Sequence, residues 1–183
     1  MKKNTRELLI DSAFISFYKH GYQGANIATI LQDVGINKGS MYHYFKSKKA
    51  LALAVIKERI ELNLIAKYEK ILEEENKLES LFYTLKMAPE TLIYGCPLNK
   101  MSQEMIYLDN DFKTLLTSVY VTFEKLIENI LIKENLSNSN LNAKLIIATY
   151  EGALSMYHLN QNKSQFREIL SQLEKELTKV KHA

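Results

Sequence analysis

Residues 27–45 of the 183-residue chain read IATILQDVGINKGSMYHYF, and this stretch decides the fold. Its first half repeats apolar residues with the spacing of one helical face, at Ile27, Ile30, Leu31 and Val34. Gly35 follows at the position where helices commonly end in a left-handed residue. A second short helix is predicted over residues 38–45, in which only Met41 and Phe45 face the core. Helix, tight turn and helix together indicate a helix-turn-helix DNA reader.

The second predicted helix carries side chains that suit DNA phosphates and base edges. They are Lys38, Gly39, Ser40, Tyr42, His43 and Tyr44. Ordinary packing is the alternative for the two tyrosines, because tyrosine is intermediate in its preference for burial. Before the first helix, Asn26 stands where its side-chain oxygen can cap free backbone N–H groups. The stretch is therefore predicted to bind DNA.

The composition predicts an ordinary globular protein of one or two small domains, almost wholly helical. Hydrophobic residues make up 46% and charged residues 25% of the chain, while Gly and Pro number six and two. Cys96 is the single cysteine, which excludes an internal disulfide and suits a reducing cytoplasm. The sequence has no apolar run as long as a membrane span. We therefore expect a cytoplasmic protein with neither a membrane segment nor a signal peptide.

Charge is unevenly distributed along the chain. Residues 1–60 hold ten Lys and Arg against four Asp and Glu, whereas residues 61–183 hold fourteen against seventeen. The net charges are thus +6 and −3, which sum to the +3 of the whole chain. A basic first third indicates a polyanionic partner for that part. A solvated helix face can give the same imbalance by chance, but its coincidence with the helix-turn-helix favours nucleic acid.

Periodicity and capping residues predict an all-α protein of about nine helices. Besides the two above, helices are expected over residues 5–21, 48–73, 77–94, 97–106, 110–134, 141–160 and 164–181. Pro89 should kink or split the helix that contains it. The apolar positions of the fourth helix include Leu51, Val55, Ile60, Leu64 and Ile71. We expect a three-helix DNA-binding domain at residues 1–50 and a helical effector-binding and dimerisation domain at residues 51–183.

The last predicted helix has apolar residues in heptad spacing. They are Phe166, Leu170, Leu173, Leu177 and Val180, with Ile169 beside them. Such a seam most often packs on its own domain. Because helix-turn-helix readers commonly bind two half-sites as dimers, we expect a homodimer built from the last two helices. Gly152 in the preceding helix would permit close approach of the two backbones there.

With these residues the chain resembles the TetR family of bacterial transcriptional regulators. The resemblance is strongest over residues 13–51, in the sequence HGY at residues 20–22, the run GINKGSMY at residues 35–42, and FKSK at residues 45–48. It departs at Ala25 and Asn26, where the family commonly has threonine or serine pairs. The resemblance implies a dimeric repressor of a palindromic operator in double-stranded DNA, released by a small-molecule or electrophile effector.

The resemblance also implies roles for particular residues. Lys38 and Gly39 would approach base edges, and Ser40 would reach a base or a phosphate. Tyr42 would touch a thymine methyl group or a phosphate. Phosphate contacts are implied for Asn26, His43, Tyr44 and Lys48.

The effector site is expected in the second domain. Its segment Gly95–Met105, GCPLNKMSQEM, resembles a branch of the family whose regulators respond to electrophiles or small organic acids. Cys96 stands before a helix start, where the dipole and Lys100 would favour a reactive thiolate. The alternative is that Cys96 is a small buried hydrophobe. Further candidates, chosen by residue type, are Phe82, Met87, Met101, Met105, Phe112, Tyr120, Tyr150 and Tyr157. Such residues fill cores more often than they line ligand pockets.

The sequence contains few features that would indicate an enzyme. Its histidines, at positions 20, 43, 158 and 182, show no metal-ligand spacing with one another or with Cys96. It contains neither a phosphate-binding glycine loop nor a nucleophile elbow. We therefore expect no catalysis, no metal and no cofactor. A helical protein-interaction module is the alternative, which would explain the heptad seam but not the basic helix-turn-helix. The operator, the effector, the regulated genes and the choice between repressor and activator stay open.

Overall fold

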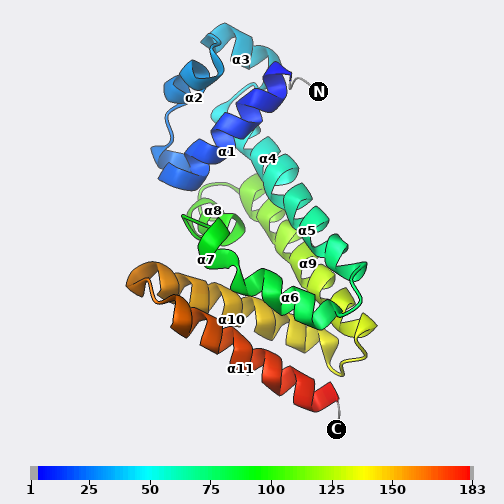
Figure 1. Cartoon of the computed structure of the whole chain (residues 1–183). Helices are drawn as coiled ribbons and strands as arrows, with labels where there is room; N and C mark the ends of the chain where they lie inside the picture. The colour runs from blue at the N-terminus through cyan, green and yellow to red at the C-terminus, as the bar shows by residue number, and fades with distance from the viewer. Residues whose placement is uncertain (1–3, 182–183) are drawn as a thin grey trace. The chain divides into compact units, whose positions relative to one another are not determined.

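The computed structural model describes the backbone of residues 4–181 and the side chains of residues 4–179. Every regular element in that part of the chain is a helix (Figure 1). In chain order they are α1 (Thr5–Gly24), α2 (Ile27–Val34), α3 (Lys38–Tyr44), α4 (Lys48–Val55), η1 (Ile56–Glu61), α5 (Leu62–Leu72), α6 (Lys77–Lys86), α7 (Ala88–Thr91), α8 (Pro97–Met105), α9 (Asn110–Lys133), α10 (Ser139–Asn160) and α11 (Lys163–Lys181). The predicted all-α fold is confirmed. Because α4, η1 and α5 follow without a break, the described chain holds ten helices rather than nine.

Proline causes the extra helix. The sequence predicts one helix over residues 77–94, with Pro89 kinking or splitting it. In the structure α6 ends at Lys86, and Pro89 lies in the first turn of the separate helix α7, which ends at Thr91. Proline lacks the N–H that would continue the α6 ladder. The predicted split is therefore confirmed, and the predicted end at residue 94 is three residues too late.

The end of α1 also differs from the prediction. The helix does not stop at Gly21 but resumes after a kink and runs to Gly24. Gly21 has φ 77°, which side chains with a Cβ rarely adopt. A Cβ at this position would also lie 2.8 Å from the Oε2 atom of Glu104 in α8. Glycine therefore allows both the kink and the close approach of α8.

The chain folds as two compact units. Unit 1 combines the residues up to 63 with residues 97–119, and unit 2 combines residues 64–96 with residues 120–183. In unit 1, α1 packs on α2, α4, η1 and α8. The fully buried side chains of its core include Leu9, Ile10, Ala13, Phe17 and Leu51. The predicted separation into a DNA-binding domain and an effector domain at residue 50 concerns function, and it stays a prediction.

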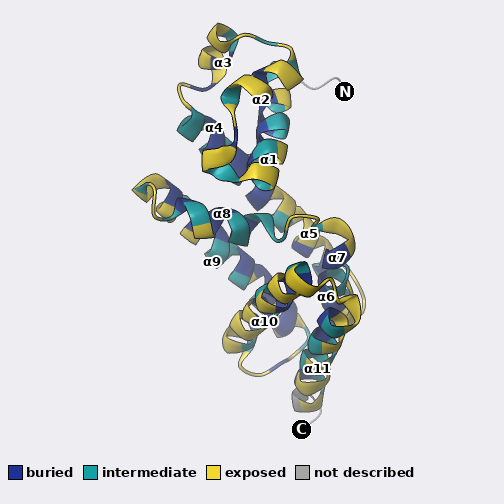
Figure 2. Ribbon diagram, turned by 90° about the vertical axis from the view of Figure 1, so that its left-hand side faces the viewer, coloured by how far each residue is buried: buried dark blue, intermediate teal, exposed yellow. Residues whose placement is uncertain are grey.

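Unit 2 is built around α6, α10 and α11. α11 packs on both α6 and α10, and Phe82, Phe123 and Phe166 are the largest fully buried side chains of the core. The rings of Tyr150 and Tyr157 have centroids 6.5 and 6.1 Å from that of Phe166. Figure 2 shows the result along α10 and α11, where buried and exposed positions alternate around each helix. The periodicity of α11 is thus the amphipathic pattern that packing requires, whereas α10 carries apolar residues on its exposed side as well.

The long helix of α4, η1 and α5 contains a π-helical segment, Ile56–Glu61, at its middle. Such segments are rare and widen the helical turn. Ile56 and Ile60 in this segment are buried, whereas Leu62 immediately after it is 52% exposed. The prediction of one long helix over residues 48–73 is confirmed in extent, but the helix is not uniform.

Candidate nucleic-acid interface and effector region

Side-chain caps begin both helices of the helix-turn-helix. The Asn26 Oδ1 atom accepts a hydrogen bond from the Ala28 N–H at 2.8 Å. The Asn37 Oδ1 atom accepts from the Ser40 N–H at 2.9 Å and from the Ser40 hydroxyl at 3.2 Å. Between the helices, Gly35 is left-handed with φ 73° and ψ 34°. Asn26 and Gly35 therefore act as the cap and the turn that the sequence predicts, and Asn37 caps the second helix.

The core side of α3 is formed by its two large apolar residues. Met41 and Phe45 are 2% and 5% exposed, as the sequence predicts. The Arg6 guanidinium lies 5.3 Å from the centre of the Phe45 ring. These contacts determine which face of the short helix α3 turns outward.

The outward face of α3 carries the residues predicted to contact DNA. Lys38, Gly39, Tyr42, His43 and Tyr44 are exposed, and Ser40 is half-buried. The Lys38 ammonium lies 5.9 Å from the centre of the Tyr42 ring. The rings of His43 and Tyr44 meet edge to face with centroids 6.3 Å apart. The structure brings these side chains together on one surface, while their contacts with DNA stay predictions.

Lys48 is bound by its own chain. Its Nζ atom donates to the carbonyl oxygen of Ala25 at 2.6 Å and to that of Gln23 at 3.3 Å. It also lies 4.9 Å from the centre of the Tyr22 ring. Burial lowers the pKa of this ammonium, an effect that the charge of Glu104 opposes. The predicted phosphate contact of Lys48 would therefore be made by an ammonium group that already donates hydrogen bonds to two carbonyl oxygens.

Glu104 joins α8 to the end of α1, and the sequence analysis did not single it out. Its Oε2 atom accepts from the Tyr22 N–H and its Oε1 atom from the Gln23 N–H, both at 2.7 Å. These two amides follow the kink at Gly21. Glu104 from α8 and Lys48 from α4 thus both bind the segment that leads from α1 into α2. No sequence signal marks Glu104, because its partners are backbone groups more than 80 residues away.

Ion pairs join the start of α9 to α4. The Lys49 Nζ atom lies 2.6 Å from Asp109 Oδ2 and 2.7 Å from Asp111 Oδ2. The hydrogen bonds to the Asp109 and Asp111 carboxylates raise the pKa of Lys49. The hydrogen bond from Lys49 in turn lowers the pKa of Asp109. Nearby, the rings of Tyr22 and Phe112 meet edge to face with centroids 5.1 Å apart. Within unit 1, residues 104–112 are therefore held to α1 and α4 by ion pairs, hydrogen bonds to backbone N–H groups and aromatic packing.

The predicted effector residues are divided between the two units. They divide into Met101, Met105 and Phe112 in unit 1, and Phe82, Met87, Cys96, Tyr120, Tyr150 and Tyr157 in unit 2. The three in unit 1 are at most 1% exposed. In unit 2, Phe82, Tyr150 and Tyr157 belong to the packed core. A role of these residues in effector binding stays a prediction, and core packing accounts for the buried ones.

Cys96 is half-buried and directly precedes α8. A thiolate there would be close enough to act electrostatically on Lys67, Tyr68 and Tyr120. Burial raises the pKa of both phenols and lowers the pKa of the Lys67 ammonium. Tyr68 and Tyr120 therefore stay protonated at neutral pH, with O–H groups that can donate hydrogen bonds.

The predicted dimerisation seam is largely used inside the chain. Phe166, Leu170 and Leu177 are 1%, 0% and 6% exposed, because α11 packs on α6 and α10. Ile169 and Leu173 are half-buried. The side chain of Val180 lies outside the described residues. The part that this seam plays in a dimer stays a prediction.

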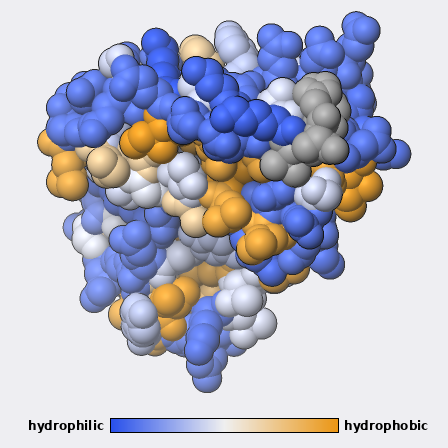
Figure 3. All heavy atoms as spheres, turned by 90° about the horizontal axis from the view of Figure 1, so that it is seen from below, coloured by the Kyte–Doolittle hydropathy of each residue, from blue (hydrophilic) through white to orange (hydrophobic). Residues whose placement is uncertain are grey.

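α10 presents another apolar face, which we call the α10 outer face. Its exposed residues follow one another at spacings of three or four, and they are Leu141, Leu145, Ala148, Gly152, Met156 and Leu159. Leu145 is 47% and Leu159 88% exposed, and a Cβ at Gly152 would meet nothing within 4 Å. On the molecular face seen in Figure 3, apolar side chains gather in patches among hydrophilic ones. Contiguous apolar surface commonly marks a site of association.

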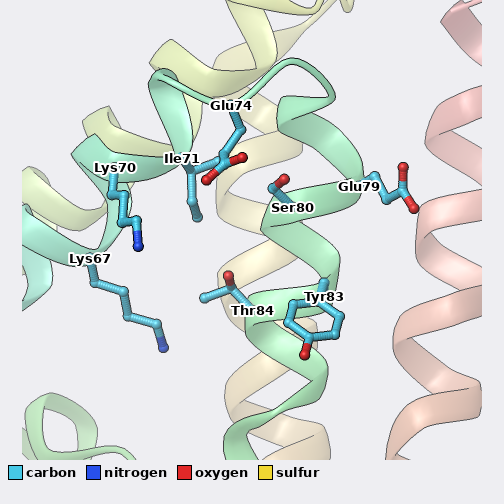
Figure 4. A pocket seen from close by; sticks show the side chains of 8 residues that line it. All are labelled: Lys67, Lys70, Ile71, Glu74, Glu79, Ser80, Tyr83 and Thr84. Atoms are coloured by element: carbon cyan, nitrogen blue, oxygen red, sulfur yellow. The ribbon is translucent and has the colours of Figure 1, made fainter.

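A cavity of about 500 Å³ opens between α5 and α6 (Figure 4). Its lining comprises Lys67, Lys70 and Ile71 of α5, Glu74 just after it, and Glu79, Ser80, Tyr83 and Thr84 of α6. None of the predicted effector residues is among them. Lysines three apart on one helix and hydroxyls four apart on the next were the available sequence signal, and such spacings are common on solvated helices.

Two further observations bear on the class of protein. Among the described residues, no group of three or more His, Cys, Asp and Glu side chains is arranged to hold a metal ion. None of the described helices combines the length and the hydropathy that crossing a bilayer demands.

Comparisons with known proteins agree with this geometry. Residues 9–55 match the family described as "Bacterial regulatory proteins, tetR family", and residues 84–172 match "Transcriptional regulator LmrA/YxaF-like, C-terminal domain". An uncharacterized HTH-type transcriptional regulator of Lactococcus lactis is 30% identical over 87% of this chain and 86% of its own length. The repressor NemR of Escherichia coli is 27% identical over 61% of this chain and 59% of its own. The crystal structure of a TetR transcriptional regulator from Legionella pneumophila superposes with a TM-score of 0.84 at 19% identity, covering 96% of this chain and 98% of that one.

Proposed function

Because this chain belongs to the TetR family of bacterial transcriptional regulators, we propose that it is a homodimeric repressor that binds a palindromic operator and is released by a small-molecule or electrophile effector. A relative that carries the name of repressor supports the direction of regulation. The basic first third of the chain supports the DNA as partner.

One observation carries the proposal. The seven-residue helix α3 buries Met41 and leaves Lys38, Tyr42 and Tyr44 exposed. A short recognition helix held in this way fits the major groove, where lysine can donate to guanine and tyrosine can contact a thymine methyl group or a phosphate. Dimerisation would place two such helices on successive half-sites.

The test is a gel-shift titration with the DNA upstream of the protein's own gene. We expect a palindromic segment there to bind, and binding to weaken steeply with salt, because phosphate contacts release counterions. Failure to bind any palindromic DNA would favour the helical protein-interaction module instead.

The Lys38→Ala variant is expected to lose about 1–3 kcal/mol of operator binding, the usual value of a base contact. It should also discriminate less well between bases at one position of each half-site. Lys113→Ala is the matched control, because Lys113 is an exposed lysine of α9 in the same unit. Equal weakening of all DNA sequences would instead assign Lys38 to a phosphate.

The proposed release by an electrophile depends on Cys96. The cysteine is half-buried and lies directly before the helix whose Glu104 binds the end of α1. We expect alkylation with N-ethylmaleimide to weaken operator binding of the wild type about tenfold or more, and to leave the Cys96→Ser variant unchanged. Because Cys96 is the single cysteine, the modification is confined to one side chain. An alkylated wild type that binds the operator normally would leave Cys96 with a structural role only.

A further inference from the structure

Lys67 and Lys70 place two ammonium groups on one side of the cavity between α5 and α6 (Figure 4). Neither forms an ion pair with a carboxylate among the described residues. The Lys67 ammonium lies 5.7 Å from the centre of the Tyr68 ring. The α5 side of the cavity therefore offers two ammonium groups to a ligand, although the two glutamates of the lining balance their formal charge.

The environment of the Lys67 ammonium also favours a bound anion. Lys67 is an exposed residue, yet desolvation lowers the pKa of its ammonium group, an effect that the charge of Cys96 opposes. A partly desolvated cation without a counter-ion is costly, and a bound anion would remove that cost.

The opposite side of the cavity offers hydroxyl donors and an apolar surface. Ser80, Tyr83 and Thr84 come from successive turns of α6 and face the same hollow as the lysine stems and Ile71. A cavity of about 500 Å³ lies within the usual range for small-ligand sites. Ammonium and hydroxyl donors beside an apolar wall suit an acid group on a small organic body.

From this arrangement we infer that the cavity between α5 and α6 binds a small organic monocarboxylate, with its carboxylate at Lys67 and Lys70 and its apolar body against Ile71 and Tyr83. Glu74 and Glu79 bring the formal charge of the lining to zero. A dianion such as phosphate would place excess negative charge near these carboxylates, whereas a monoanion would not. In Figure 4 the Glu79 carboxylate points away from the lysines, whereas the Glu74 carboxylate lies between Ile71 and Ser80.

The experiment is calorimetric titration of the full-length protein, without DNA, with acetate, benzoate and octanoate. Benzamide serves as the neutral match for benzoate, and inorganic phosphate as the dianion. We expect at least one monocarboxylate with an apolar body to bind, and benzamide and phosphate to bind much more weakly. Lys67→Met, which keeps the stem but removes the charge, should weaken carboxylate binding about tenfold or more.

Controls separate the site from general charge and from misfolding. Lys70→Met and Thr84→Val should each weaken the same ligand, while Lys125→Met should not, because Lys125 is exposed on α9. Thermal unfolding without ligand shows whether each variant is folded. The inference is overturned if no monocarboxylate binds, if benzamide or phosphate binds as tightly, or if the folded Lys67→Met and Lys70→Met variants bind normally.

The inference rests on the proposed function only for its regulatory meaning, namely that such a carboxylate would act as the effector. Binding of the probe is measured on the free protein, whereas DNA binding is measured by gel shift. A failure to bind the carboxylate therefore does not contradict DNA binding, and a failure to bind DNA does not contradict carboxylate binding.

Discussion

The Leu145→Glu variant is expected to sediment as a monomer and to bind its operator about a hundredfold or more weakly than the wild type. Leu145 lies on the α10 outer face and is 47% exposed in the single chain. A second copy of the chain packed on this face would bury it, and a carboxylate there would be desolvated without a partner. Because two linked recognition helices bind far more tightly than one, loss of the dimer should reduce operator affinity much more than loss of any one base contact.

Sedimentation equilibrium and gel shift measure the two parts of this prediction separately. Asn129→Glu is the control, because it adds the same charge at an exposed position of α9 in unit 2. It should remain dimeric and bind the operator normally. A Leu145→Glu protein that stays dimeric would exclude the α10 outer face as the interface.

The Glu104→Ala variant is expected to lower the free energy of unfolding by about 1–3 kcal/mol, because it leaves the Tyr22 and Gln23 amides without their acceptor. For a chain of this size that corresponds to about 2–4 °C in Tm for each kcal/mol. Operator affinity should fall as well, since the segment that Glu104 binds leads into α2. Thermal unfolding and gel shift provide the two measurements.

Two variants test this explanation. Glu104→Gln keeps one carbonyl oxygen and should lose less stability than Glu104→Ala. Gln103→Ala removes the neighbouring side chain, which is exposed and bonded only to Asn99 among the described residues, and should leave both Tm and operator binding near the wild-type values. If Glu104→Ala matched Gln103→Ala in both measurements, the two hydrogen bonds would contribute nothing to the fold.

Local signals were sufficient to predict the helix-turn-helix. The cap residues Asn26 and Asn37, the left-handed Gly35 and the buried Met41 act within a few residues of their own positions. Each can therefore be read from the sequence without knowledge of the remaining fold. The same holds for Pro89, whose missing N–H interrupts a helix wherever it is packed.

Tertiary contacts account for what could not be predicted. Glu104 and Lys48 bind backbone atoms, which leave no mark in the sequence. Met101 and Phe112 were pocket candidates on the basis of residue type alone. Flexible and aromatic side chains also fill cores, and both of these residues are buried. The heptad seam of α11 is apolar, but its periodicity does not indicate whether the helix that packs on it belongs to the same chain.

The π-helical segment Ile56–Glu61 has a consequence for the phase of the long helix. Along that helix the apolar positions advance by four from Leu51 to Val55, by five to Ile60, and by four again to Leu64. The interval of five is one residue more than a regular α-helix needs to return to the same side, and the wide turn absorbs that residue. In a regular α-helix the surplus residue would rotate all later positions by about 100°. With the wide turn in place, Tyr68 and Ile71 are buried and Leu62 is left in solvent. A single added residue is thus accommodated inside one continuous helix, and the apolar positions before and after it stay on the same side of that helix.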